Sequence, residues 1–298
     1  DILREKLGKV VGNIFAILYI WYFIHLASLV FRNFGEFICT VTYPETPIVV
    51  VIGVFAVVLA YTVNGGIEVM GRLSELLVPV IPLLFFIICL SILTVHDFTA
   101  FLPILENGIK PVLSAAFDYI SFPFGETVAF LMIFLHLNKK EKLKKVVFTS
   151  SVVSILLTVM VFFRDIFALG ADLMSRATFN PHLTSLLIPG LNVESLVDIN
   201  LLIGGGVKIS VCVYAAANAL SQIAGIDDYR KLTRAIVTFC VVLSVWVYEN
   251  ILEMFSWAEK VWPYYSIPFQ IAIPLLLLLL SIRKKGKTSK AKAGSRKG

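Results

Sequence analysis

Ser121-Phe122-Pro123-Phe124-Gly125-Glu126 lies in the middle of an apolar stretch, residues 116–137, that is long enough to be a membrane-spanning helix. Proline has no backbone N–H to donate and glycine is a weak helix former, so the stretch predicts an interrupted helix. Glu126 follows directly, and a carboxylate near the centre of a bilayer costs about 2.5–3.5 kcal/mol. Broken backbone at that depth is tolerated only where protein or a water-filled cavity surrounds it. The stretch therefore predicts a binding site of the kind found in transporters.

The composition of the whole chain is that of a membrane protein. Of its 298 residues, 58% are hydrophobic and only 15% are charged, whereas a soluble domain carries about 25% charged residues. Eight stretches are long and apolar enough to span a bilayer. They are residues 10–31, 47–63, 76–95, 116–137, 146–163, 201–223, 235–255 and 262–282. We predict an all-α, polytopic membrane bundle over residues 1–282 and a basic, disordered tail over residues 283–298.

Lysine and arginine predict how these spans are oriented. Twenty of the 26 basic residues lie on the side of the N-terminus, including five between Lys139 and Lys145 and eight in the tail, and five lie on the opposite side. Cytoplasmic loops carry such an excess of positive charge, so both ends of the chain are expected in the cytoplasm. The longest loops, residues 97–115 and 164–200, then face outward and are expected to carry short helices or lids.

No pattern in the sequence is typical of an enzyme, a metal site, a cofactor site or nucleic-acid binding. The four cysteines lie in or beside apolar segments without paired spacing, so they are expected to be small packing residues. The Walker loop, the HExxH motif and the GxSxG motif are absent. The net charge of +6 is concentrated in short loops and the tail. The candidate functional residues are therefore polar side chains inside the spans, and the expected partners include the lipid bilayer.

Two ionisable residues inside the spans are the first candidates. Glu126 either faces a substrate cavity, where it holds an amine or a proton, or pairs with a neighbouring helix. The half-helix after Gly125 would also point free N–H groups at the break, which suits a carboxylate ligand. Lys208 follows three glycines near the start of its span. It is either a fixed cation in place of a sodium ion, and so a candidate for ion coupling, or a side chain that reaches to the outer interface.

Other polar residues lie within two of the spans. Tyr214 shares a helical face with Ser210 and Asn218, and this face either lines a ligand path or bonds a neighbouring helix. Tyr22 and His25 are one turn apart in the first span. Tyr22 either contacts a ligand or packs between helices, and His25 either relays protons or has a structural partner. The predicted ligand-binding residues are Ser121, Phe122, Pro123, Phe124, Gly125, Glu126, Tyr22 and Tyr214.

Several motifs along the whole chain resemble one family, and the most specific of them is the break itself. They are Leu7-Gly8-Lys9, Leu29-Val30-Phe31-Arg32-Asn33-Phe34, Pro44-Glu45, Phe122-Pro123-Phe124-Gly125-Glu126 followed by Val128-Ala129-Phe130-Leu131-Met132-Ile133-Phe134, and Val207-Lys208-Ile209-Ser210-Val211 with Tyr214-Ala215-Ala216. In these residues the chain resembles the spore-germination permeases, the B subunits of nutrient germinant receptors, within the amino acid/polyamine/organocation transporter superfamily. One departure is Leu135-His136, where the family often has a proline.

The resemblance implies a LeuT-like fold, an inverted repeat of five plus five helices with the ligand between broken first and sixth helices. Residues 116–137 match the sixth helix and residues 10–31 the third. We therefore expect eight of ten spans here, the first two being absent, and further residues upstream of Asp1.

The resemblance also implies a receptor subunit in the spore inner membrane or cell membrane. It would bind a small nutrient, with an amino acid favoured, and signal to A- and C-type partner subunits. A proton-coupled amino-acid transporter is the alternative, as is a non-catalytic membrane scaffold or a truncated fragment.

Overall fold

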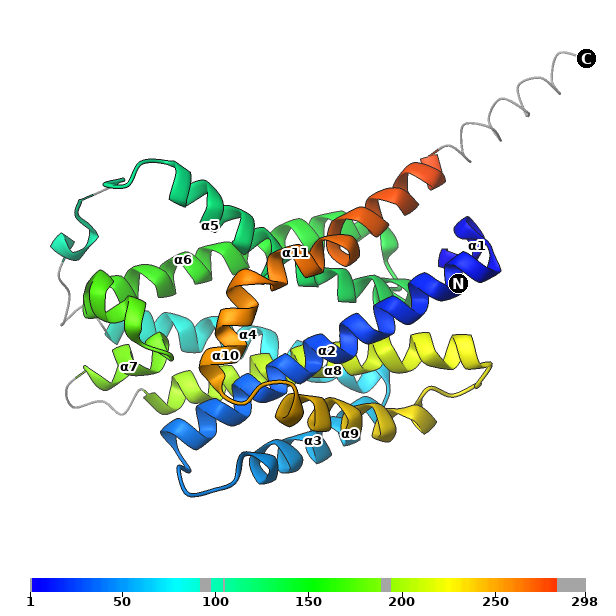
Figure 1. The fold of residues 1–298 in the computed structure, drawn as a ribbon, viewed down its shortest axis with the longest axis horizontal. Helices are drawn as coiled ribbons and strands as arrows, with labels where there is room; N and C mark the ends of the chain where they lie inside the picture. Colours follow the sequence, from blue (N-terminus) through cyan, green and yellow to red (C-terminus); the bar gives the residue numbers. More distant parts are fainter. Residues whose placement is uncertain (1, 92–97, 104, 189–193, 283–298) are drawn as a thin grey trace, which may run out of the picture. The chain divides into compact units, whose positions relative to one another are not determined.

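The computed structural model describes residues 2–91, 98–103, 105–188 and 194–282 (Figure 1). The elements among these residues are all helices. The chain divides into two compact units. The first consists of Asp1–Arg32, Lys110–Met132 and Val211–Gly298, and the second of Asn33–Ile109 and Ile133–Ser210. Two long helices, α2 (Lys9–Val41) and α8 (Glu194–Ala224), contribute one part to each unit.

The first unit is built around buried faces of α2, α8 and α9. Tyr22, Leu26 and Ala27 of α2 are almost completely buried, as are Val213 of α8 and Cys240 of α9. Its remaining elements are α1 (Ile2–Leu7), α5 (Lys110–Ser121), the 3-10 helix η3 (Phe124–Met132), α9 (Arg230–Trp246), α10 (Ile251–Lys260), α11 (Trp262–Ile267) and the π-helical turn η6 (Pro268–Ala272). α9 and α10 meet at a bend of 99° (Figure 1).

The second unit has a core between the end of α2 and α3. The rings of Phe34 and Phe55 lie 4.1 Å apart, and a side chain at Gly35 would overlap Ile52. The other elements are α3 (Ile48–Asn64), α4 (Ile67–Ser91), η2 (Phe98–Phe101), η4 (Phe134–His136), η5 (Lys140–Lys142), α6 (Leu143–Arg176) and α7 (Asn180–Leu186). α6 is kinked at Gly170, whose φ of 70° lies in the left-handed region that favours glycine.

The all-α, membrane-spanning architecture predicted from the sequence is confirmed. Among the described residues, five helices are long and apolar enough to cross a membrane, or six if the bent pair of α9 and α10 is counted as one span. The five are Lys9–Val41, Ile67–Leu90, Lys140–Arg176, Glu194–Ala224 and Trp262–Ile282. The apolar α3 has 17 residues and falls just short of that length. The count of eight spans and the inverted repeat remain predictions, and the basic tail lies outside the described residues.

The predicted interruption of residues 116–137 is present. α5 ends at Ser121, and the chain continues as the tighter helix η3 from Phe124. α5 begins at Lys110, earlier than the sequence predicted, because Pro111 favours the first turn of a helix, where its missing N–H is not needed. The long loop predicted over residues 164–200 is largely wrong, because α6 continues to Arg176 and α8 begins at Glu194. The short helix α7, which was expected there, lies between them.

Candidate functional site

The helix break leaves a backbone carbonyl that its own helix does not satisfy. In a continuous α-helix the carbonyl of Ser121 would accept a hydrogen bond from the N–H of residue 125. Here the Nε2 of Gln270, in η6, donates to the Ser121 carbonyl oxygen over 2.9 Å. The side chain of a distant segment therefore replaces the donor that the interrupted helix lost.

Gln270 joins the break to α2 as well. Its Nε2 also donates to the hydroxyl of Tyr22 over 2.9 Å, and the Tyr22 side chain is fully buried. The backbone of Gly125 lies directly against the side-chain oxygen of Gln270, so a β-carbon at position 125 would overlap it. Three segments far apart in the sequence thus meet at a single amide group. We call Tyr22, Ser121, Gly125 and Gln270 the amide bridge.

Glu126 lies next to the amide bridge. It is in the first turn of η3, its side chain is only 6% exposed, and its carboxyl group lies near the Tyr22 hydroxyl. Ser121 is buried as well, whereas Phe122 and Pro123 are exposed and Phe124 is half-buried. The structure therefore brings together four of the eight predicted ligand-binding residues, Tyr22, Ser121, Gly125 and Glu126.

Aromatic rings enclose the amide bridge on the side of α11 and η6. The Tyr22 ring stacks on Phe269 at 4.7 Å between ring centroids and on Trp262 at 5.6 Å. Tyr265 lies within 6.3 Å of Tyr22 and 5.6 Å of Phe269. Such rings exclude water and lower the local dielectric, so the hydrogen bonds of Gln270 and the charge of Glu126 act more strongly than they would in water.

His25 has two tyrosine neighbours. Its Nδ1 lies 3.4 Å from the Tyr265 hydroxyl and its Nε2 lies 3.4 Å from the Tyr248 hydroxyl. Both ring nitrogens thus face protein groups, in agreement with the structural alternative for this histidine rather than with an open proton path.

Arg32 fastens α2 to the bend between α9 and α10. Its Nη1 donates to the carbonyl oxygens of Ser244 at 3.2 Å and Tyr248 at 2.7 Å, and its Nη2 donates to that of Glu249 at 3.0 Å. The last carbonyls of a helix have no partner within it and carry partial negative charge. A buried guanidinium therefore stabilises the end of α9 and fixes the bent geometry.

Tyr214 and Lys208 lie elsewhere in the fold. Tyr214 is 2% exposed, and its ring meets Tyr229 edge-on at 5.1 Å. Burial raises the pKa of the Tyr229 hydroxyl, which keeps this contact neutral. Lys208 is half-buried in the part of α8 that belongs to the second unit, whereas the break belongs to the first. A coupling role for Lys208 and a ligand contact for Tyr214 remain predictions.

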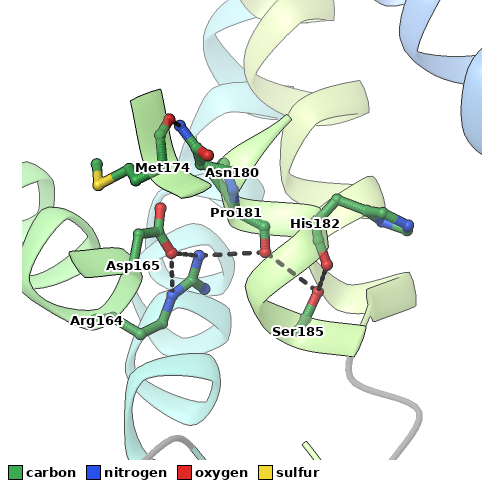
Figure 2. Close-up of polar contacts among 7 residues, drawn as sticks. All are labelled: Arg164, Asp165, Met174, Asn180, Pro181, His182 and Ser185. Carbon is green, nitrogen blue, oxygen red and sulfur yellow. Dashed lines mark hydrogen bonds and ion pairs between the residues drawn. The ribbon is translucent and has the colours of Figure 1, made fainter. Parts of the chain in front are cut away.

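The second unit contains a buried polar cluster of its own (Figure 2). Nε of Arg164 donates to the carboxylate of Asp165 at 2.8 Å, and its Nη2 donates to the carbonyl of Pro181 at 3.2 Å. Ser185 donates to the same Pro181 carbonyl at 3.1 Å, and Asn180 donates to the carbonyl of Met174 at 3.1 Å. The cluster anchors the short helix α7 to α6, which is a structural task.

Two important residues were not singled out from the sequence. Gln270 is the lone amide in the apolar stretch 262–282, and a polar side chain in such a stretch is itself a signal of internal contacts. Arg32 was assigned to a loop beyond the first span, but α2 continues to Val41 and the side chain is 4% exposed. Hydropathy shows where an apolar stretch ends. It cannot show that an arginine beyond that point is buried and donates hydrogen bonds to backbone carbonyls of another helix.

Comparison with known proteins shows what the chain is related to. A family model described as "Spore germination protein" matches residues 1–252. The chain belongs to this family of spore permeases. Spore germination protein KB of Bacillus subtilis (strain 168) is 33% identical over 98% of this chain and 80% of its own length. Spore germination protein YndE of the same organism is 25% identical over 95% of this chain and 78% of its own length. No solved structure matches the chain.

Membership in the spore germination family confirms the resemblance in the sequence motifs. The chain is an integral membrane protein related to the B subunits of germinant receptors, and the family is one of permeases and receptor subunits rather than of enzymes. The matched region contains the α5–η3 break but ends before Gln270. The functional meaning of the amide bridge therefore rests on its geometry.

Proposed function

We propose that this spore germination protein binds a small nutrient, preferably an amino acid, at the break between α5 and η3. The observation that carries the proposal is a buried carboxylate, Glu126, beside the amide bridge at an interrupted membrane helix. Buried ionisable groups in membrane helices are costly and mark functional sites by default. Irregular backbone at membrane depth is the usual setting of ligand sites in transporter-like folds.

The break offers partners of opposite charge for the two ends of an amino acid. An ammonium group is suited to the Glu126 carboxylate, the Ser121 carbonyl and the Tyr22 hydroxyl, which all present oxygen atoms. A carboxylate is suited to the start of η3, because the first backbone N–H groups of a helix have no acceptor within that helix. Hydrogen bonds to charged groups contribute about 1.5–3 kcal/mol each. A zwitterion therefore fits the chemistry of the break better than a neutral sugar does.

Binding at the break becomes a signal if the ligand prefers one arrangement of the helices. A ligand shifts a conformational equilibrium only by its difference in affinity between the two states. The break contacts α11 and η6, which belong to the last membrane-spanning helix. We propose that rearrangement of this helix is passed to A- and C-type partner subunits in the spore inner membrane, with both ends of the chain in the cytoplasm.

The first test is the germination response of spores. Spores that lack the intact gene, and its sister receptors, are exposed to single amino acids and sugars, and the gene is then restored at full length. Glu126→Gln is expected to raise the half-maximal nutrient concentration about tenfold or more, because each factor of ten corresponds to about 1.4 kcal/mol of lost binding. The matched control is Glu141→Gln, which alters an exposed glutamate in η5 and is expected to leave the response unchanged.

The abundance of the variant proteins in spore membranes separates binding from folding. A wild-type dose response of Glu126→Gln, at wild-type abundance, would remove Glu126 from the site. If the deletion has no effect on any response, the receptor assignment itself is wrong.

Proton-coupled amino-acid transport is the second candidate, and half-buried Lys208 inside an apolar helix is the observation in its favour. Uptake of a labelled amino acid by the purified full-length protein in vesicles, abolished by an uncoupler, would support it. A membrane scaffold is the third alternative. It predicts a normal nutrient response after changes at the break but a lost response after changes in the outer loops.

A further inference from the structure

The side-chain amide of Gln270 occupies a position that requires a hydrogen-bond donor. Its Nε2 donates to two oxygen atoms at 2.9 Å each, the Ser121 carbonyl and the Tyr22 hydroxyl. Both acceptors are buried with their residues. A buried carbonyl without a donor costs about 1–3 kcal/mol, so an N–H donor at this point stabilises the fold.

A primary ammonium group can also donate to these two oxygen atoms, and it adds a positive charge. It carries three N–H donors, compared with two on an amide nitrogen. The neighbouring Glu126 side chain is buried, and its carboxyl group lies near the Tyr22 hydroxyl. A negative charge in a surrounding of low dielectric favours a cation over a neutral amide at the same distance. The neutral amide of Gln270 is therefore bound at this position more weakly than a primary ammonium group would be.

The segment that carries Gln270 is suited to movement. η6 is a π-helical turn of five residues, and such turns are frequent at functional sites. η6 contacts η3, and α11 contacts α5, so the segment touches both sides of the break. The amide oxygen of Gln270 lies against the backbone of Gly125, which has no side chain that could hold the amide in place.

From these contacts we infer that Gln270 is an internal competitor of the nutrient. Its amide holds the ammonium position while no ligand is bound, and a ligand with a primary ammonium group displaces it. The displaced side chain gives up the two hydrogen bonds that join η6 to Tyr22 and to Ser121, which couples occupancy of the site to the last helix. This inference rests on the proposed function, because it requires the nutrient to bind at the break.

The test measures the dose response of spores that carry full-length Gln270→Ala or Gln270→Met. Methionine keeps the length of the side chain but cannot donate. The probes are the twenty L-amino acids given singly, followed by the N-acetyl derivative and the methyl ester of each one that triggers germination. Removing a competitor that occupies most sites is expected to lower the half-maximal concentration about three- to tenfold. The ester is expected to retain activity better than the N-acetyl derivative, which has no ammonium group.

Gln222→Ala is the matched control, because Gln222 also lies in the first unit but its amide bonds Asn218 of its own helix. This variant is expected to leave the dose response unchanged. Immunoblots of spore membranes give the abundance of each protein. A higher or unchanged half-maximal concentration in both Gln270 variants would overturn the inference, as would failure of both variants to accumulate, which would make Gln270 a structural bridge.

Glu126→Gln tells the two failures apart. If it weakens the response while the Gln270 variants do not sharpen it, the displacement model alone is wrong. If Glu126→Gln has no effect, or if no amino acid triggers germination, the break is not an amino-acid site and both proposals fail.

Discussion

Position 125 shows how a single residue type is required by the contacts of the amide bridge. A β-carbon there would overlap the Gln270 amide and lie 2.9 Å from the carbonyl oxygen of Ile120. The amide belongs to a side chain that can rotate, but the carbonyl is backbone and cannot move without shifting the end of α5. Glycine is therefore needed for close approach, and it also weakens the helix at the same point.

Gly125→Ala is expected to destabilise the protein by about 1–3 kcal/mol, because the buried bonds of Gln270 are lost without replacement. Gly53→Ala in α3 is the control, since a β-carbon at Gly53 would meet open space. Thermal unfolding of the two purified variants in detergent, followed with a thiol-reactive dye that labels buried Cys212 and Cys240 as they become exposed, provides the comparison. Equal midpoints for the two variants would contradict the crowded geometry at Gly125.

The sequence predicted the residues of the helix break better than the residue that joins the break to the other helices. Proline, glycine and glutamate at 123, 125 and 126 each have a local meaning, since they interrupt a helix and bury a charge. Tyr22 was a candidate because a tyrosine inside a span either contacts a ligand or packs between helices. The partner that joins them, Gln270, is 145 residues away from Gly125 in the chain, and only the fold brings it to the break.

Helix α6 carries two arginine–aspartate pairs that differ mainly in burial. Arg164 and Asp165 have side-chain exposures of 2% and 4%, whereas Arg176 and Asp172 have 74% and 79%. The buried pair also holds α7 through the Pro181 carbonyl (Figure 2). Removing one partner of a buried pair leaves an uncompensated charge, but an exposed pair contributes little because water screens it.

Arg164→Met is therefore expected to cost about 3–5 kcal/mol of stability, and Arg176→Met less than about 1 kcal/mol. The thiol-dye measurement in detergent, applied to both variants, gives the two shifts in unfolding midpoint. A small shift for Arg164→Met would mean that Asp165 finds another partner or that water reaches the cluster.

Comparing the predicted spans with the observed helices shows what the sequence can and cannot predict at the scale of helices. Apolar length predicted where most spans lie, because burial in lipid imposes it on the sequence directly. It did not predict the 99° bend between α9 and α10, since residues 235–255 are apolar apart from Thr238, Ser244, Glu249, Asn250 and Glu253. The bend is fixed by Arg32, a residue on another helix, and hydropathy contains no information about such a contact.

The charges of the molecule as a whole predict its orientation in the membrane. Lys140 lies in the lysine-rich segment predicted on the cytoplasmic side, and Lys260, at the end of α10, lies on the predicted outer side. Both side chains are exposed, so both positions are open to reagents in solution. The two positions lie in different units, so the test samples one position in each unit.

Single-cysteine variants of the full-length protein without its native cysteines test this orientation. In intact cells, Lys260→Cys is expected to react with a membrane-impermeant maleimide, and Lys140→Cys is expected to react only after permeabilisation, because cytoplasmic loops retain the excess of lysine and arginine. Labelling of both positions from the same side would show an even number of spans between them, against the three predicted. That outcome would contradict the predicted arrangement of spans, whereas labelling of Lys140→Cys alone in intact cells would reverse the predicted orientation.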